Sequence, residues 1–189
     1  MLAEIDFSAL EFRVLSCFWK DPEMVEYASD KGLDIHRDMA TECYLLEKEQ
    51  VSKEIRYCGK NMLVFPLFYG SYHAPCARNL WEAMDKLHLT TKNGTPLKEH
   101  LASKGIVELG KCLPAEKSVK GTFEWHIEKV EKNFYAKFPV FAESRDKWYA
   151  DYRKKGCFRL MTGFVCSGLY SKNFILNVIA QGPGSNCKL

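Results

Sequence analysis

One stretch, residues 56–70, restricts the local fold more than any other part of the sequence. It reads RYCGKNMLVFPLFYG. Arg56 and Lys60 are four residues apart, so a helix places both on one face, where two cations repel each other unless an anion lies in front of them. Gly59 weakens such a helix and Pro66 kinks or breaks its far end. A single straight helix is therefore not expected here.

A triphosphate would supply the missing anion, because arginine grips phosphate oxygens through a planar fork and lysine acts as a point charge. Phe65, Phe68 and Tyr69 offer flat faces on which a nucleic-acid base can stack, and Gly70 lets the chain turn. By itself this stretch leaves open the alternative that the basic face is simply solvated.

Length and charge allow a real core but argue against binding driven by overall charge. The chain has 189 residues, of which 47% are hydrophobic and 27% charged, with a formal net charge of +3. Nucleic-acid contacts would therefore depend on local placement of charge. The eight cysteines form no C-x-x-C pair and no apolar run has membrane length, which argues against a zinc ribbon, a redox motif or a membrane protein. We expect a cytoplasmic protein with reduced thiols.

The N-terminal segment is expected to combine a strand with a helix. Residues 2–7 predict a short strand, and the helix that follows should end near Trp19. Ser8 and Glu11 have the spacing of a capping box, which makes Ser8 the expected N-cap. Asp6 would then lie between strand and helix, where a carboxylate can be held over a cleft. Plain turn and cap roles for Asp6 and Glu11 remain the alternative.

Two further helix starts carry candidate residues. Asp34 predicts the N-cap of a helix over residues 35–46, and His36 in its first turn would lie where backbone N–H groups favour an anion. A solvent-facing His36 without a ligand is the alternative. Ser52 is expected to precede the helix that carries Arg56.

The C-terminal part predicts helices followed by strands. The expected elements are helices at 127–138 and up to about 155, and strands at 157–165 and 170–176 around a hairpin at 166–168.

Four motifs in this sequence together resemble those of the family A DNA polymerases. They are Asp6–Arg13 (D-F-S-A-L-E-F-R), Asp34–His36 (D-I-H), residues 56–70 (R-x-x-x-K, then an aromatic residue and Y-G) and Asn177–Gly182 (N-V-I-A-Q-G). All four occur in the family's order with nearly its spacing, within about residues 2–72 and 134–186. The segment VFPLFYG is more similar to phage members than to bacterial ones, which would place the protein in the cytoplasm of a bacterial host.

The resemblance implies a catalytic site for deoxynucleotide transfer to a primer 3′ end. Asp6 would be catalytic and would ligate two Mg²⁺ ions, with the backbone carbonyl of Phe7 as a further ligand. Lys60 would also be catalytic, because it is placed to protonate the leaving pyrophosphate. Glu11 would exclude a ribose 2′-hydroxyl and so select deoxynucleotides.

The resemblance also implies a set of residues that bind nucleotide and DNA. The phosphates of the dNTP would be held by His36, Arg56 and Lys60. Phe65 would stack on the incoming base, and Tyr69 would guard the template position. Contacts with template–primer DNA are implied for Tyr69, Gly70, Asn177 and Gln181.

The sequence departs from the family pattern in two ways that bear on function. It carries one extra residue between Lys60 and Tyr69, so the stacking position falls on Phe65 or on Val64. It contains no H-D-E triplet, the motif of the second catalytic aspartate, so the Mg²⁺ site is incomplete in this chain. We therefore expect a chain that is inactive alone and is completed by separate chains carrying the thumb and the H-D-E palm piece. The alternative is a non-catalytic fragment that binds nucleotide, template–primer DNA or a replication partner.

The fold implied by the resemblance is α+β, with a mostly helical fingers subdomain and a few antiparallel strands of an incomplete palm. Residues 1–20 would form a palm strand and helix with the first catalytic motif. Residues 21–155 would form the fingers, with an insertion near 74–133. Residues 156–189 would form a palm hairpin and the start of the Q-G helix.

Overall fold

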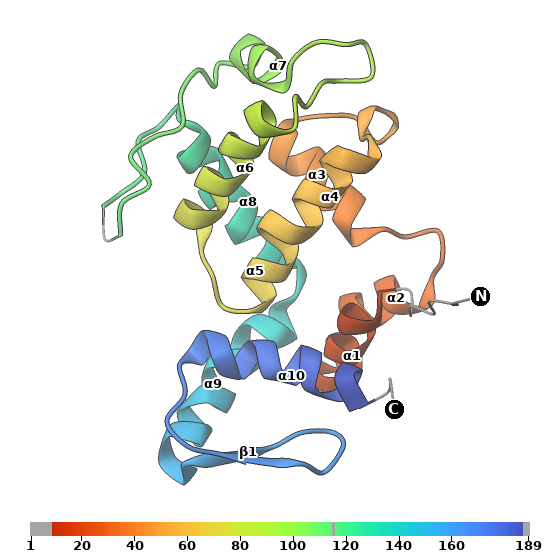
Figure 1. Cartoon of the computed structure of the whole chain (residues 1–189), viewed down its shortest axis with the longest axis vertical. Coiled ribbons are helices and arrows are strands. Elements are labelled where there is room, and N and C mark those ends of the chain that lie inside the picture. The colour runs from red at the N-terminus through yellow and green to blue at the C-terminus, as the bar shows by residue number, and fades with distance from the viewer. Residues whose placement is uncertain (1–8, 115, 187–189) are drawn as a thin grey trace, which may run out of the picture. The chain divides into compact units, whose positions relative to one another are not determined.

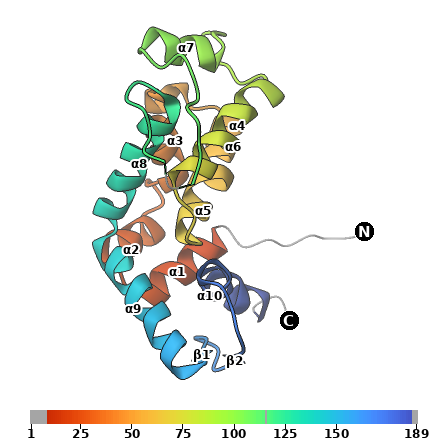
Figure 2. The same ribbon diagram turned by 90° about the vertical axis from the view of Figure 1, so that its left-hand side faces the viewer.

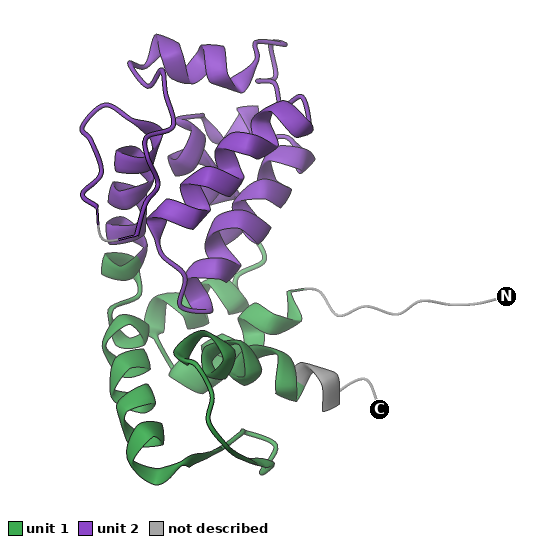
Figure 3. Ribbon diagram, turned by 60° about the vertical axis from the view of Figure 1, so that its left-hand side comes forward, with its two compact units in different colours: residues 1–32, 135–189 green, residues 33–134 purple. Residues whose placement is uncertain are grey.

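The chain folds into two compact units that are mostly helical (Figures 1 and 3). Unit 1 comprises residues 1–32 and 135–189, and unit 2 comprises residues 33–134. The structure is a computed structural model that describes residues 9–114 and 116–186, with side chains described as far as Pro183.

Unit 2 is a group of helices around an aromatic and aliphatic core. Its elements are α3 (Ile35–Tyr44), the 3-10 turn η1 (Lys48–Gln50), α4 (Lys53–Gly59), the π-helix η2 (Lys60–Val64), α5 (Phe65–Phe68), α6 (His73–Lys86), α7 (Leu97–Ser103) and most of α8 (Phe123–Lys137). Helices α3, α4, α6 and α8 lie close together (Figure 1). Fully buried side chains fill the space between them, among them Met39, Ile55, Phe68, Phe123 and Phe134.

Two helix starts in unit 2 are confirmed as predicted. The Asp34 carboxylate accepts hydrogen bonds from the backbone N–H groups of His36 and Arg37, at 3.1 and 3.2 Å. The Ser52 hydroxyl accepts one from the backbone of Ile55 at 3.2 Å. These side chains satisfy N–H groups that the first helical turn leaves without a partner.

The helix that carries Arg56 and Lys60 changes its hydrogen-bond pattern where an interruption was expected. Helix α4 passes directly into η2, in which the backbone N–H of Phe65 donates to the carbonyl of Lys60, five residues back. Pro66 has no N–H to donate and lies in the first turn of α5, where this is tolerated. The straight α-helix thus ends before Pro66, in a π turn.

Unit 1 combines four helices with a small antiparallel sheet among the described residues. The elements are α1 (Leu10–Trp19), α2 (Pro22–Ser29), α9 (Pro139–Lys155), β1 (Cys157–Arg159), β2 (Val165–Ser167) and α10 (Lys172–Asn186). Strands β1 and β2 pair with Phe158 opposite Cys166, and both follow the end of α9 (Figure 2). Helix α1 packs against α2, α9 and α10, and Leu15, Phe141 and Ile179 are fully buried.

The predicted strand at residues 170–176 is wrong, because α10 begins at Lys172. Its buried positions include Ile175, Leu176 and Ile179, a helical spacing that a short apolar run does not reveal in advance. The Ser171 hydroxyl accepts a hydrogen bond from the backbone of Phe174 at 3.2 Å, as a helix cap does.

The hairpin turn was also predicted in the wrong place. Residues 165–167 form strand β2, and the turn lies at residues 160–164 instead of 166–168. There the backbone N–H of Leu160 donates to the carbonyl of Phe164 at 2.8 Å. Gly163 has a φ of 88°, a conformation that glycine adopts without strain.

The predicted Ser8 cap is wrong as well, because Ala9 occupies the N-cap position of α1, with φ 52° and no side-chain cap. The expected strand at residues 2–7, with Asp6 and Phe7, and the side chain of Ser8 lie outside the described residues.

The α+β fold class is confirmed by the mostly helical architecture with one small antiparallel sheet. The subdomain boundaries and the insertion at 74–133 stay predictions. In the part of the chain that the structure describes, no helix has the length and apolar character needed to cross a membrane.

Candidate phosphate-binding site

The three residues predicted to bind phosphate lie on neighbouring elements of unit 2. His36 lies in the first turn of α3, Arg56 in α4 and Lys60 at the start of η2. Both Arg56 and Lys60 act electrostatically on the His36 ring, lowering its pKa. The structure therefore brings the three side chains into one cluster, here called the phosphate cluster.

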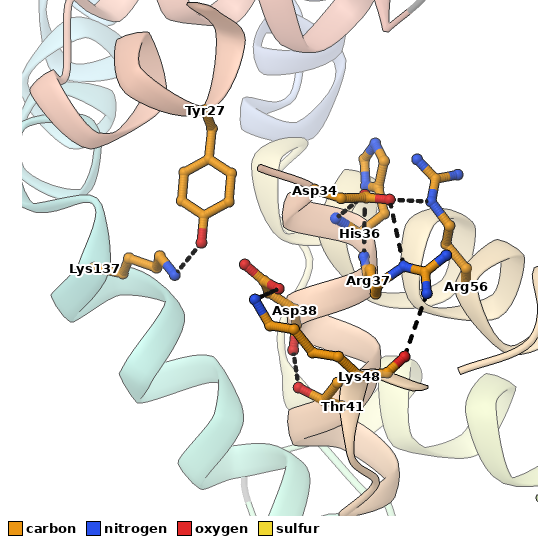
Figure 4. Close-up of polar contacts among 9 residues, drawn as sticks. All are labelled: Tyr27, Asp34, His36, Arg37, Asp38, Thr41, Lys48, Arg56 and Lys137. Carbon is orange, nitrogen blue, oxygen red and sulfur yellow. Dashed lines mark hydrogen bonds and ion pairs between the residues drawn. The ribbon is translucent and has the colours of Figure 1, made fainter. Parts of the chain in front are cut away.

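Asp34 is the anion that contacts Arg56 at this site (Figure 4). Its Oδ2 accepts a hydrogen bond from Arg56 Nε at 2.6 Å, while its Oδ1 accepts the two backbone bonds that cap α3. Burial works to raise the pKa of Asp34, but the hydrogen bonds from Arg56 and the Arg37 backbone and the charge of Arg56 outweigh it, so the pKa is lowered. Asp34 is therefore ionised at neutral pH.

Sequence reasoning assigned Asp34 a capping role and missed its contact with Arg56. The two residues are 22 positions apart, and no local pattern connects them. Arg37 shows how selective the contact is: its Nε is 4.0 Å from Asp34 Oδ2, and its Nη1 donates to the backbone carbonyl of Lys48 instead, at 3.3 Å.

Gly59 allows α3 and α4 to approach each other at this site. A Cβ at position 59 would lie 3.0 Å from the Cβ of Ala40 and 3.1 Å from the carbonyl oxygen of His36. Any larger residue would push α4 away from the first turns of α3. The glycine that weakens the helix thus places Arg56 and Lys60 beside His36.

His36 is a neutral imidazole in this environment. Its side chain is buried, with 3% exposure, and Nδ1 has no hydrogen-bond partner among the described residues. Burial lowers the pKa of His36 to about 4, and repulsion from Arg56 and Lys60 acts in the same direction against the attraction of Asp34. A neutral imidazole can donate one hydrogen bond to a phosphate oxygen.

Phe65, which follows the π turn η2, lies beside the Lys60 and His36 side chains of the phosphate cluster. Lys60 Nζ lies 5.2 Å from the centroid of the Phe65 ring, close enough for a cation–π contact. The His36 and Tyr69 rings lie at 5.4 and 5.8 Å from the same centroid, and the Tyr69 ring is stacked on it. Phe65 is 7% exposed whereas Val64 is fully buried, so of the two candidates for base stacking only Phe65 reaches the surface. Its stacking role stays a prediction.

The candidate DNA contacts divide between the units. In unit 2, Gly70 follows Tyr69 with a φ of 88°, in the left-handed region that favours glycine. In unit 1, Asn177 and Gln181 lie one turn apart on α10; Gln181 is exposed, and Asn177 Oδ1 is buried without a partner among the described side chains. Glu11, in the first turn of α1, is half-buried.

The Q-G pair on α10 has a packing reason that the sequence did not show. A Cβ at Gly182 would lie 2.7 Å from Leu160 Cδ1, so glycine lets α10 contact the chain just after β1.

The described residues offer no complete metal site. Nowhere among them do three His, Cys, Asp or Glu side chains come together in a group that could hold a metal ion. The predicted Mg²⁺ ligands, Asp6 and Phe7, lie outside the described part.

Comparisons with known proteins concern the family and the fold. Residues 1–87 match the model of DNA polymerase family A. No curated protein matches the sequence. Among solved structures, the POL domain of Pol1 from M. smegmatis, in complex with DNA primer-template and dNTP, aligns with a TM-score of 0.55 and 17% sequence identity. The alignment covers 94% of this chain and 26% of that one, so the chain spans about a quarter of its length. The family match over residues 1–87 and the similar fold support a resemblance to a fragment of a family A DNA polymerase.

Proposed function

We propose that the chain takes part in template-directed DNA synthesis and that unit 2 binds the triphosphate of the incoming deoxynucleotide. The observation that carries this proposal is the phosphate cluster, in which His36, Arg56 and Lys60 converge beside the N-terminus of α3. The cluster falls within the residues that match the family model.

The chemistry of the cluster suits a polyphosphate. Arg56 uses Nε for Asp34, and its two terminal amino groups are left to bind phosphate oxygens. Lys60 adds a mobile point charge, and neutral His36 adds a hydrogen bond without further repulsion. In the transfer reaction, Lys60 would also donate a proton to the departing pyrophosphate.

The rest of the proposed reaction uses residues of unit 1. Glu11 would reject ribonucleotides, and Asn177 and Gln181 would contact the primer terminus. Asp6 and the carbonyl of Phe7 are oxygen donors of the kind Mg²⁺ prefers, and bound Mg²⁺ would supply charge stabilisation for the transfer. Separate chains with an H-D-E palm piece and a thumb would complete the enzyme. The DNA and dNTP in the M. smegmatis complex support these ligands.

Lys60→Ala tests the phosphate assignment directly. We expect dATP to bind about tenfold more weakly, because one charge-assisted contact is lost. The matched control is Lys53→Ala, which removes an exposed lysine two turns earlier, at the start of α4. Equal dATP affinities for the wild type and Lys60→Ala, measured by calorimetry, would contradict the assignment.

Primer extension distinguishes synthesis from binding alone. A binding module is the second candidate, because the phosphate cluster lies wholly within unit 2 and does not need unit 1 to be complete. We expect extension when the chain is mixed with a polypeptide that carries the H-D-E hairpin and thumb, and its loss with Asp6→Asn. Nucleotide binding without extension in that mixture would favour the binding module.

A further inference from the structure

We propose that Asp34 is a positioning residue for the nucleoside triphosphate: its carboxylate fixes the Arg56 guanidinium so that both terminal amino groups face the phosphates. The inference rests on the proposed function of the phosphate cluster. It concerns a residue that would not itself contact the nucleotide.

The hydrogen bond pattern of Arg56 is the first step of the argument. A guanidinium has five N–H groups, and among the described residues only the one on Nε has an acceptor, Asp34 Oδ2 at 2.6 Å. Within the described part of the chain, Arg56 makes no other side-chain hydrogen bond, and its side chain is 36% exposed. Fixing Nε fixes the plane of the fork, because the guanidinium is rigid and planar. Of the four terminal N–H groups, one runs parallel to the Nε–H and the other three point away from it.

The second step is that Asp34 is itself fixed. Its Oδ1 accepts from the backbone N–H groups of His36 and Arg37, which belong to the first turn of α3. One carboxylate therefore holds the backbone of His36 and the side chain of Arg56 in a common frame. Two of the three phosphate-binding residues depend on it.

Charge alone predicts the opposite effect of removing Asp34. An anion next to a phosphate site repels the ligand, so neutralising it should tighten triphosphate binding. If Asp34 acts by positioning, neutralising it releases the Arg56 side chain, and binding should weaken because the arginine must then lose rotamer freedom on binding. The sign of the change therefore separates the two explanations.

Asp34→Asn is the decisive variant, because asparagine is as good an N-cap as aspartate and α3 should keep its start. Calorimetry with sodium tripolyphosphate and with dATP should show binding about fivefold to tenfold weaker than in the wild type. Arg37→Gln is the control: it removes a neighbouring cation that Asp34 does not hold by a hydrogen bond, and it should change affinity less than about twofold. Unchanged or tighter binding in Asp34→Asn would overturn the inference.

A second measurement needs no ligand. The Arg56 Nε–H should give a protected ¹⁵N NMR signal in the wild type and lose protection in Asp34→Asn and in Asp34→Ser, which keeps a capping side chain in case one variant folds poorly. An unprotected signal in the wild type would overturn the inference by itself. Adding Asp34→Asn to an Arg56→Gln chain should cost no further affinity, because the positioned group is already gone.

The failure of this inference differs from failure of the proposed function. A wild-type chain that binds neither tripolyphosphate nor dATP contradicts the proposed function, and the inference falls with it. A wild-type chain that binds both ligands, with an unchanged Asp34→Asn variant, contradicts the inference alone.

Discussion

Asp21 in unit 1 and Asp34 in unit 2 are two carboxylates with the same local task and different second contacts. Each caps a helix with Oδ1: Asp21 accepts from the backbone of Glu23 and Met24 at the start of α2, as Asp34 does at the start of α3. The Oδ2 of Asp21 accepts two more backbone bonds, from Val140 and Phe141 at the start of α9, at 2.9 and 3.0 Å. The Oδ2 of Asp34 holds the side chain of Arg56.

The difference is that Asp21 holds backbone groups of two helices, whereas Asp34 holds a side chain. Asp21 is 0% exposed, and within the described part of the chain its carboxylate accepts four bonds from backbone N–H groups, two at the start of α2 and two at the start of α9. It therefore links these two helices and is not accessible to a ligand. The side chain of Asp34 is 29% exposed, and the four terminal N–H groups of Arg56 have no acceptor among the described residues. One capping carboxylate therefore ties a helix junction together, and the other holds an arginine of the proposed phosphate site.

The largest expected effect on stability is that of replacing Asp21. Asp21→Ala leaves four backbone N–H groups without their partner, and burial makes this costly, so we expect a loss of about 3–5 kcal/mol in the free energy of unfolding. Urea unfolding measures it. Asp30→Ala is the control, since Asp30 accepts a single bond, from the backbone of exposed Gly32, and should cost less than about 1 kcal/mol. Equal losses in the two variants would remove Asp21 from its junction role.

Lowering the pH should destabilise unit 2 more than unit 1. All five histidines lie in unit 2, and the pKa of His36 is lowered from 6.5 to about 4. The unfolded chain then binds more protons between those pH values, so His36 contributes its full stability above about pH 6.5 and loses it as pH falls towards 4.

At pH 5 this amounts to a loss of about 2 kcal/mol relative to pH 7. His126, whose pKa burial also lowers, acts in the same direction. Amide hydrogen exchange at the two pH values should show the weakening in unit 2, and His36→Gln should reduce it. A loss confined to unit 1 would contradict the assignment.

The smallest expected effect is that of Asp34→Asn on stability. Asparagine retains the cap, and a partly exposed ion pair adds little, so we expect a change below about 1 kcal/mol in urea unfolding. The same variant should nevertheless weaken triphosphate binding, and this split marks a residue that serves a ligand. A destabilisation as large as that of Asp21→Ala would place Asp34 with the structural ties.

Local sequence signals predicted the helices better than the contacts between them. The caps at Asp34 and Ser52 depend on residues two or three positions apart, and both were found. The second contacts of Asp21 and Asp34 span about 120 and 22 positions, and no pattern in one sequence reports them. The strand prediction for residues 170–176 failed for another reason, because a short apolar run is compatible with both a strand and a buried helix.

For the site, the motifs predicted that His36, Arg56 and Lys60 lie close together, and the structure places them so. Their roles stay predictions. The near-complete burial of Phe65 could not be foreseen, because it depends on how α5 packs in unit 2. The glycine at position 59 was judged by helix propensity, although its tight fit against α3 is what matters.

The π turn η2 makes the length of this helix adjustable. One residue added to an α-helix rotates every later side chain by about 100° around the axis. A π turn, in which the N–H of residue 65 bonds to the carbonyl of residue 60, accommodates one extra residue locally. The extra residue that the family resemblance indicates between Lys60 and Tyr69 therefore need not rotate the aromatic side chains of α5 to another face. A chain that is one residue shorter here can therefore keep the same aromatic face, and aligning it with this one without a gap would place Phe65 opposite the wrong residue.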